Sequence, residues 1–110
     1  MQRIITLPER KAAEAARRTA AVQAIIPMLT AYARQHGGRF LLFGSAARGQ
    51  MKFHSDVDLL VDFPSEHMSD AWCFAENACW DHGLEPDILP YRGCKPAFLH
   101  HVAPDIRVVA

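Results

Sequence analysis

The stretch that decides the fold is Phe40–Phe63, FLLFGSAARGQMKFHSDVDLLVDF. It begins as an apolar run, breaks at Gly44 and Ser45, crosses a polar segment and becomes apolar again. The second run carries carboxylates at alternate positions, and side chains two apart in a strand point to the same face of the sheet. The pattern therefore predicts a largely buried strand with acids on one side.

The acids Asp56 and Asp58 are the candidate metal ligands. Two neighbouring carboxylates repel each other, so ionising both in a partly buried place is unfavourable unless a cation lies between them. Oxygen ligands suit Mg²⁺, which also accepts substrate phosphates as ligands. A third carboxylate on a neighbouring strand would complete a two-metal site, and Asp87 is the candidate. Asp62 lies at the strand end and is interpreted as a solvated or outer residue.

The Gly44-Ser45 break predicts a phosphate-binding turn. Glycine lets a phosphate approach the backbone closely, and amides at the start of the next helical turn favour an anion. The Ser45 hydroxyl can donate to a phosphate oxygen, while Arg48 either adds charge there or forms a surface ion pair. Ser55 is a turn residue or a substrate contact. Neither GxxxxGK[ST] nor GxSxG occurs, which excludes a Walker loop and a nucleophile elbow.

The rest of the chain predicts helices and strands around this stretch. A helix capped by Thr6 runs to Gly37, and Pro27 is expected to kink or split it. Trp72 and Trp80 fall in a second amphipathic helix and are interpreted as core or interface residues. Further strands are expected over 39–43, 56–63, 85–89 and 106–110, with helical segments over 45–48, 65–82 and 95–101. This order fits an α/β or α+β class and one domain over residues 1–110.

Composition narrows the class of protein. Half of the 110 residues are apolar, which is typical of a globular domain, and 12 acidic residues balance 12 Lys and Arg. A dedicated nucleic-acid binder usually has a basic excess, so no direct nucleic-acid partner is expected. No apolar run approaches the ~20 residues of a membrane span, and no signal peptide is recognised, so a cytoplasmic location is expected. The three cysteines are interpreted as reduced thiols.

Together, GSAARG and the SDVDLLV that follows resemble the signature of the DNA polymerase β-like nucleotidyltransferases, in particular the minimal nucleotidyltransferases (MNT) of prokaryotes. The resemblance implies a small mixed sheet flanked by helices. It also implies that Gly44 and Ser45 hold the triphosphate of ATP with support from Arg48. The family usually has an apolar residue before its third acid. Here that position is Pro86, although Ile88 after Asp87 fits.

The same resemblance implies the reaction and the partner. Asp56, Asp58 and Asp87 would bind two Mg²⁺ ions, and Asp87 would help to activate the acceptor hydroxyl. The usual partner of an MNT is a helical HEPN toxin, so an antitoxin that transfers AMP from ATP to a tyrosine of that toxin is implied. Two alternatives stay open: an antitoxin that neutralises its partner by binding alone, and a nucleotidyltransferase acting on a small molecule.

Overall fold

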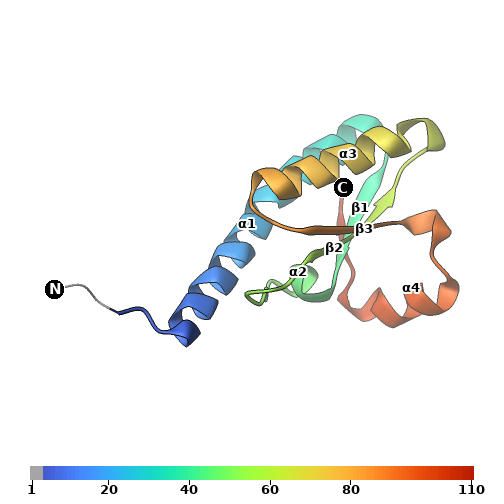
Figure 1. Cartoon of the computed structure of the whole chain (residues 1–110). Helices are drawn as coiled ribbons and strands as arrows, with labels where there is room; N and C mark the ends of the chain where they lie inside the picture. The colour runs from blue at the N-terminus through green and yellow to red at the C-terminus, as the bar shows by residue number, and fades with distance from the viewer. Residues whose placement is uncertain (1–3) are drawn as a thin grey trace.

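The computed structural model describes residues 4–110 as a four-stranded mixed sheet with helices on both faces (Figure 1). The strands are β1 (Arg39–Phe43), β2 (Val57–Asp62), β3 (Pro86–Pro90) and β4 (Arg107–Val109). Their order in the sheet is β3-β2-β1-β4, with β1 antiparallel to β2 and β4, and β2 parallel to β3. The mixed α+β fold predicted from the sequence is confirmed.

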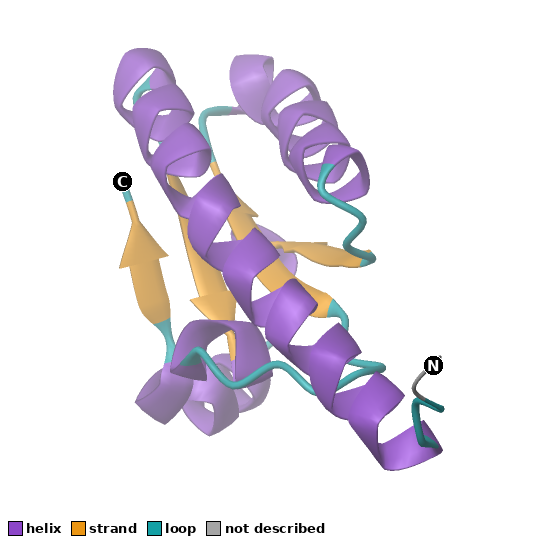
Figure 2. Ribbon diagram, turned by 90° about the vertical axis from the view of Figure 1, so that its left-hand side faces the viewer, coloured by secondary structure: helices purple, strands orange, loops and turns teal. Residues whose placement is uncertain are grey.

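The helices are α1 (Leu7–His36), the short α2 (Gly44–Arg48), α3 (Ser65–Asp81) and α4 (Pro96–Val102). Helices α1 and α3 cover one face of the sheet and α4 covers the other, as Figure 2 also shows. None of these helices is both long and apolar enough to cross a bilayer, in the part of the chain described.

Alternation along β2 divides the core between the two faces. Val57, Leu59 and Val61 point toward α1 and α3, where Ile25 and Leu29 of α1 are fully buried. Leu60 points the other way and packs in the cluster that contains Val102 of α4. Asp58 has the same parity as Leu60, so the sheet presents its carboxylate on the α4 face.

Helix α1 begins as predicted, with the Thr6 hydroxyl accepting a hydrogen bond from the Glu9 amide at 3.2 Å. The prediction that Pro27 could split it is wrong, because one helix of 30 residues continues through that position. Proline supplies no N–H to the preceding turn. The buried side chains of Ile25 and Leu29 on either side hold the helix against the sheet, and this packing outweighs the lost bond.

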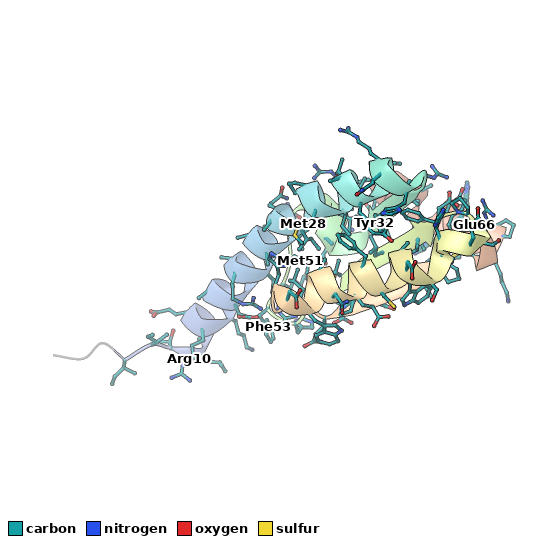
Figure 3. All side chains as sticks on the ribbon, turned by 90° about the horizontal axis from the view of Figure 1, so that it is seen from above. Arg10, Met28, Tyr32, Met51, Phe53 and Glu66 are labelled. Atoms are coloured by element: carbon teal, nitrogen blue, oxygen red, sulfur yellow. The ribbon has the colours of Figure 1, made fainter. Side chains whose placement is uncertain are left out.

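The first turns of α1 extend beyond the sheet, whereas its second half lies beside α3 (Figures 1 and 3). Tyr32 lies between these two helices, with its ring stacked on Phe74 at a centroid distance of 4.2 Å. The paired helices thus form one layer on the side of the sheet opposite α4.

Candidate active site

The Asp58 carboxylate is the centre of the site, because β2 lies between β1 and β3. In the sheet register Asp58 pairs with Phe43 of β1 on one side and with Asp87 of β3 on the other. Gly44 directly follows Phe43. The structure therefore brings together the glycine turn and two of the predicted acids, although Asp87 is 29 positions after Asp58 in the chain.

The electrostatics of Asp58 show how close these carboxylates are. The pKa of Asp58 is raised to about 6, chiefly by burial and in addition by the neighbouring carboxylates of Asp87 and Asp56. Asp56 is exposed and lies one residue before β2, rather than inside the strand as predicted. Asp87 is also exposed. The site thus has one partly buried carboxylate flanked by two that reach solvent.

Two features of the structure require glycine at position 44: the backbone conformation and the lack of space for a side chain. Its φ of +64° lies in the left-handed region, which glycine adopts without the steric cost of a side chain. A Cβ at this position would stand 2.6 Å from Asp58 Oδ2. Any other residue would therefore collide with the carboxylate, so the turn can lie directly against Asp58 only because residue 44 is glycine.

The Ser45 hydroxyl is only weakly engaged within the chain. It donates to the Met51 sulfur at 3.5 Å, and a thioether is a poor acceptor. Arg48, at the end of α2, forms an ion pair with Asp105 at 2.9 Å, and both side chains are roughly half exposed. An exposed pair of this kind holds its partners loosely, which leaves Arg48 free to exchange Asp105 for another anion.

Ser55 has a structural place in the loop before Asp56. Its hydroxyl accepts a hydrogen bond from the Lys52 amide at 2.9 Å, as expected of a turn residue. Its carbonyl accepts one from Arg18 of α1 at 2.8 Å. Arg17, the preceding residue of α1, donates to the Gly83 carbonyl at 2.7 Å, just before β3. Two arginines of α1 thus anchor the segments that lead into both acid-bearing strands.

These arginines were not recognised from the sequence. Lys and Arg on an amphipathic helix usually form a solvated face. Their acceptors are backbone carbonyls 37 and 66 positions away. No local pattern encodes such a contact, because any loop residue offers the same carbonyl.

Asp62 lies apart from the other acids. It is at the far end of β2 from Asp58, about 13 Å away along the strand. Its carboxylate forms ion pairs with Arg39 at 2.8 Å and with Arg92 at 3.6 Å. The Asp62 carboxylate is therefore paired with two arginine side chains. His100 and His101, a pair that could suggest a metal ligand, are both exposed on α4.

The donor set fits a hard divalent cation. Among residues 4–110, no group of three His, Cys, Asp or Glu side chains is close enough to form a compact metal centre. Asp56, Asp58 and Asp87 nevertheless supply only carboxylate oxygens, and they interact strongly enough to raise the pKa of Asp58. A cation with oxygen ligands, such as Mg²⁺, would relieve that repulsion while keeping several waters.

A family model described as "Nucleotidyltransferase domain" matches residues 29–106, more than half of the chain. The chain belongs to this nucleotidyltransferase domain family. The matched segment contains the glycine turn and all three candidate acids. Domains of this family act on nucleoside triphosphates and generally use a divalent metal.

A solved structure described as that of a "putative minimal nucleotidyltransferase" is similar to the whole fold. It is 26% identical to this chain with a TM-score of 0.64, and the match covers 81% of this chain and 93% of that chain. The protein is thus a nucleotidyltransferase of the minimal type. No curated protein shows significant sequence similarity to it.

Proposed function

We propose that this nucleotidyltransferase transfers AMP from ATP to a tyrosine of a HEPN toxin, and thereby acts as its antitoxin. The observation that carries the proposed chemistry is the position of Asp58, between the Gly44 turn on one side and Asp87 on the other. The toxin, the tyrosine and ATP follow from the resemblance of GSAARG and SDVDLLV to the minimal nucleotidyltransferases.

The glycine turn is the proposed phosphate side of the site. Gly44 carries no side chain, so the backbone is open to the β- and γ-phosphates of the nucleotide. The Ser45 hydroxyl can turn from the Met51 sulfur to a phosphate oxygen, which is a stronger acceptor. Arg48 adds positive charge when it leaves Asp105. These residues hold the leaving pyrophosphate and orient the α-phosphorus toward Asp58.

The acids are the proposed reacting side. Asp56, Asp58 and Asp87 would hold Mg²⁺, with two ions expected. Bound there, Mg²⁺ would stabilise negative charge on the attacking and leaving oxygens. Asp87 accepts the proton of the tyrosine hydroxyl. The tyrosine oxygen then forms a bond to the α-phosphorus, the bond from the α-phosphorus to the bridging oxygen breaks, and pyrophosphate leaves with that electron pair.

The experiment compares the wild type with Asp56→Asn and Asp58→Asn. Each protein is incubated with ATP, Mg²⁺ and the candidate toxin, and two properties are measured: AMP on the toxin by mass spectrometry, and loss of toxicity in cells. The proposal expects both variants to lose AMP transfer and neutralisation together, and expects a chelator to abolish transfer by the wild type.

Two other results would replace this proposal. Neutralisation that survives in variants without AMP transfer would show an antitoxin that acts by binding alone. Transfer of AMP to a small hydroxyl compound, with none to the toxin, would show a small-molecule nucleotidyltransferase.

A further inference from the structure

The Arg18 side chain of α1 joins three segments of the chain, two of which lead to the proposed catalytic acids. Its guanidinium Nε donates to Glu14 Oε1 at 2.9 Å, one turn earlier in the same helix. Nη1 donates to the Ser55 carbonyl at 2.8 Å, and Nη2 lies 3.9 Å from Glu85 Oε1. Each nitrogen is thus directed to a different segment: α1, the loop before β2, and the segment before β3.

The burial of Arg18 separates its role from that of Arg48. Only 13% of the Arg18 side chain is exposed, whereas 48% of Arg48 is. A charged side chain is rarely buried this far unless it is paired. Because each guanidinium nitrogen of Arg18 already faces a partner within the chain, little of the group is open to a phosphate. Arg18 therefore holds segments of the protein together, whereas Arg48 is available to a nucleotide.

The contact with the Ser55 carbonyl fixes the peptide that leads to Asp56. The C=O of Ser55 and the N–H of Asp56 belong to one planar unit, so a donor that holds the carbonyl also orients the start of Asp56. Asp56 lies one residue before β2 and outside the register with β1 and β3, whereas Asp58 is paired on both sides. The position of Asp56 thus depends on the loop, and Arg18 fixes that loop to α1.

The segment before β3 is bonded to β2 at the same place. The Val57 amide, next to Asp56, donates to the Glu85 carbonyl at 2.8 Å, and Glu85 is two residues before Asp87. Arg18 therefore contacts both segments where they are hydrogen-bonded to each other. Helix α1 covers the face of the sheet opposite α4, so Arg18 acts on these segments from behind, through the backbone.

We infer that Arg18 is a positioning residue, which holds Asp56 where it can share a divalent cation with Asp58 and Asp87. It does so by fixing the peptide between Ser55 and Asp56, and it touches neither the cation nor the nucleotide. This inference rests on the metal site of the proposed function, and it does not depend on the toxin or its tyrosine.

The direction of a change in metal affinity distinguishes this role from a simple charge effect. Arg18 is positive, so removing its charge alone would strengthen the binding of a cation nearby. Loss of its hold on Asp56 would weaken that binding, and residues that orient metal ligands typically contribute ten- to a hundredfold in affinity. Arg18→Ala should therefore weaken metal binding about tenfold, although it removes a positive charge. Arg18→Lys keeps the charge but not the planar fork, so its affinity should lie between those of wild type and Arg18→Ala.

The experiment titrates the full chain with Mn²⁺ and follows the free ion by electron paramagnetic resonance. Mn²⁺ suits the same carboxylate and water ligands as Mg²⁺. The matched control is Arg39→Gln, because Arg39 forms a similar ion pair, with Asp62 at 2.8 Å, at the other end of β2. The control should bind Mn²⁺ as the wild type does, and circular dichroism checks that each variant is folded. If Arg18→Ala does not fold, Arg18→Lys carries the test. Wild-type affinity in a folded Arg18 variant, or an equal loss in Arg39→Gln, would overturn the inference.

A second measurement needs no metal. Relaxation of ¹⁵N nuclei reports the mobility of the backbone amides of Asp56 and Asp58 in the free protein. In the Arg18 variants we expect the Asp56 amide to become more mobile, while the Asp58 amide stays ordered because its strand is paired on both sides. An Asp56 amide as ordered in these variants as in the wild type would show that Arg18 does not hold this peptide.

Asp58→Asn separates failure of this inference from failure of the proposed metal site. If the wild type binds Mn²⁺ more tightly than Asp58→Asn does, and the Arg18 variants bind it as the wild type does, only the inference is wrong. If wild type and Asp58→Asn bind Mn²⁺ equally, the acids hold no cation. The metal site of the proposed function is then wrong, and the role of Arg18 falls with it.

Discussion

The Asp58 carboxylate lies against the backbone of Gly44, so closely that a Cβ on residue 44 would be 2.6 Å from Asp58 Oδ2. Gly44 is the first residue of α2, directly after β1, and Asp58 belongs to β2, the strand that pairs with β1. The absence of a side chain at residue 44 leaves space both for the carboxylate and for a phosphate. The contact joins the two halves of the proposed site.

Replacing Gly44 by alanine tests this contact. Gly44→Ala must accept a left-handed backbone, which costs about 1–2 kcal/mol, and must also displace Asp58. We expect nucleotidyl transfer to fall at least a hundredfold. The matched control is Gly37→Ala, because Gly37 has a φ of +70° with nothing within 4 Å of an added Cβ. The control should lose about 1 kcal/mol in urea unfolding and retain activity. Equal activity in the two variants would contradict the account.

The raised pKa of Asp58 predicts a pH-dependent stability of the metal-free protein. Asp58 ionises near 3.8 in the unfolded chain and near 6 in the folded one, so between these values the folded state binds more protons. Stability due to protonated Asp58 is present at low pH and is lost as the pH rises through about 6. Asp58→Asn does not ionise. Its free energy of unfolding relative to wild type should therefore increase from pH about 4 to pH about 6 and then level off.

The measurement is urea unfolding of both proteins across that pH range, with a chelator present. Comparison with the variant cancels groups such as Glu14, whose pKa is lowered to about 2 by hydrogen bonds from Arg17 and Arg18. A difference between wild type and Asp58→Asn that is flat across the range would show that Asp58 ionises in the folded chain as it does in the unfolded one.

Arg48 is predicted to serve the nucleotide rather than the fold. Its ion pair with Asp105 is exposed, and such pairs contribute about 0–1 kcal/mol to stability. Arg48→Ala should therefore change the melting temperature little and raise the KM for ATP about tenfold. Asp105→Ala breaks the same pair but frees Arg48, so it should leave the KM for ATP unchanged or lower it. If both variants raise the KM equally, the pair itself orders the site and Arg48 makes no separate phosphate contact.

Asp62 provides the contrast to Asp58 on the same strand. Asp62→Asn removes the ionic partner of Arg39 and Arg92, so we expect a loss of about 1 kcal/mol in unfolding free energy. Because the two acids are at opposite ends of β2, AMP transfer should stay within about twofold of wild type. A loss of transfer like that in Asp58→Asn, with the fold intact by circular dichroism, would place Asp62 in the site.

Local signals predicted most of the elements. The cap at Thr6, the helix ends at Gly37 and Gly49 and the apolar strands depend on neighbouring residues, and the structure confirms them within one or two positions. Asp87 was the candidate third acid because of its place in a short expected strand, although Pro86 precedes it. Pro86 is the first residue of an edge strand, a place that tolerates proline because no partner strand requires its N–H.

Contacts between distant segments could not be predicted. Helix α1 continues through Pro27 because it packs on the sheet. Two arginines of α1 donate hydrogen bonds to backbone carbonyls far along the chain. The groove lined by Trp72, Trp80 and Asp87 exists only where α3 passes over the edge of β3. Periodicity placed both tryptophans on a helix, but it could not show that Trp80 stays exposed beside Asp87.

The central claim is that Asp58, between Gly44 and Asp87, supports transfer of a nucleotidyl group to protein. The most direct measurement supplies ATP labelled either at the α- or at the γ-phosphate, with Mg²⁺ and the toxin, to the wild type and to Asp58→Asn. We predict that only the α-label becomes attached to a toxin tyrosine, that the γ-label leaves in pyrophosphate, and that Asp58→Asn attaches neither. Attachment of the γ-label, or undiminished attachment of the α-label by Asp58→Asn, would contradict the account.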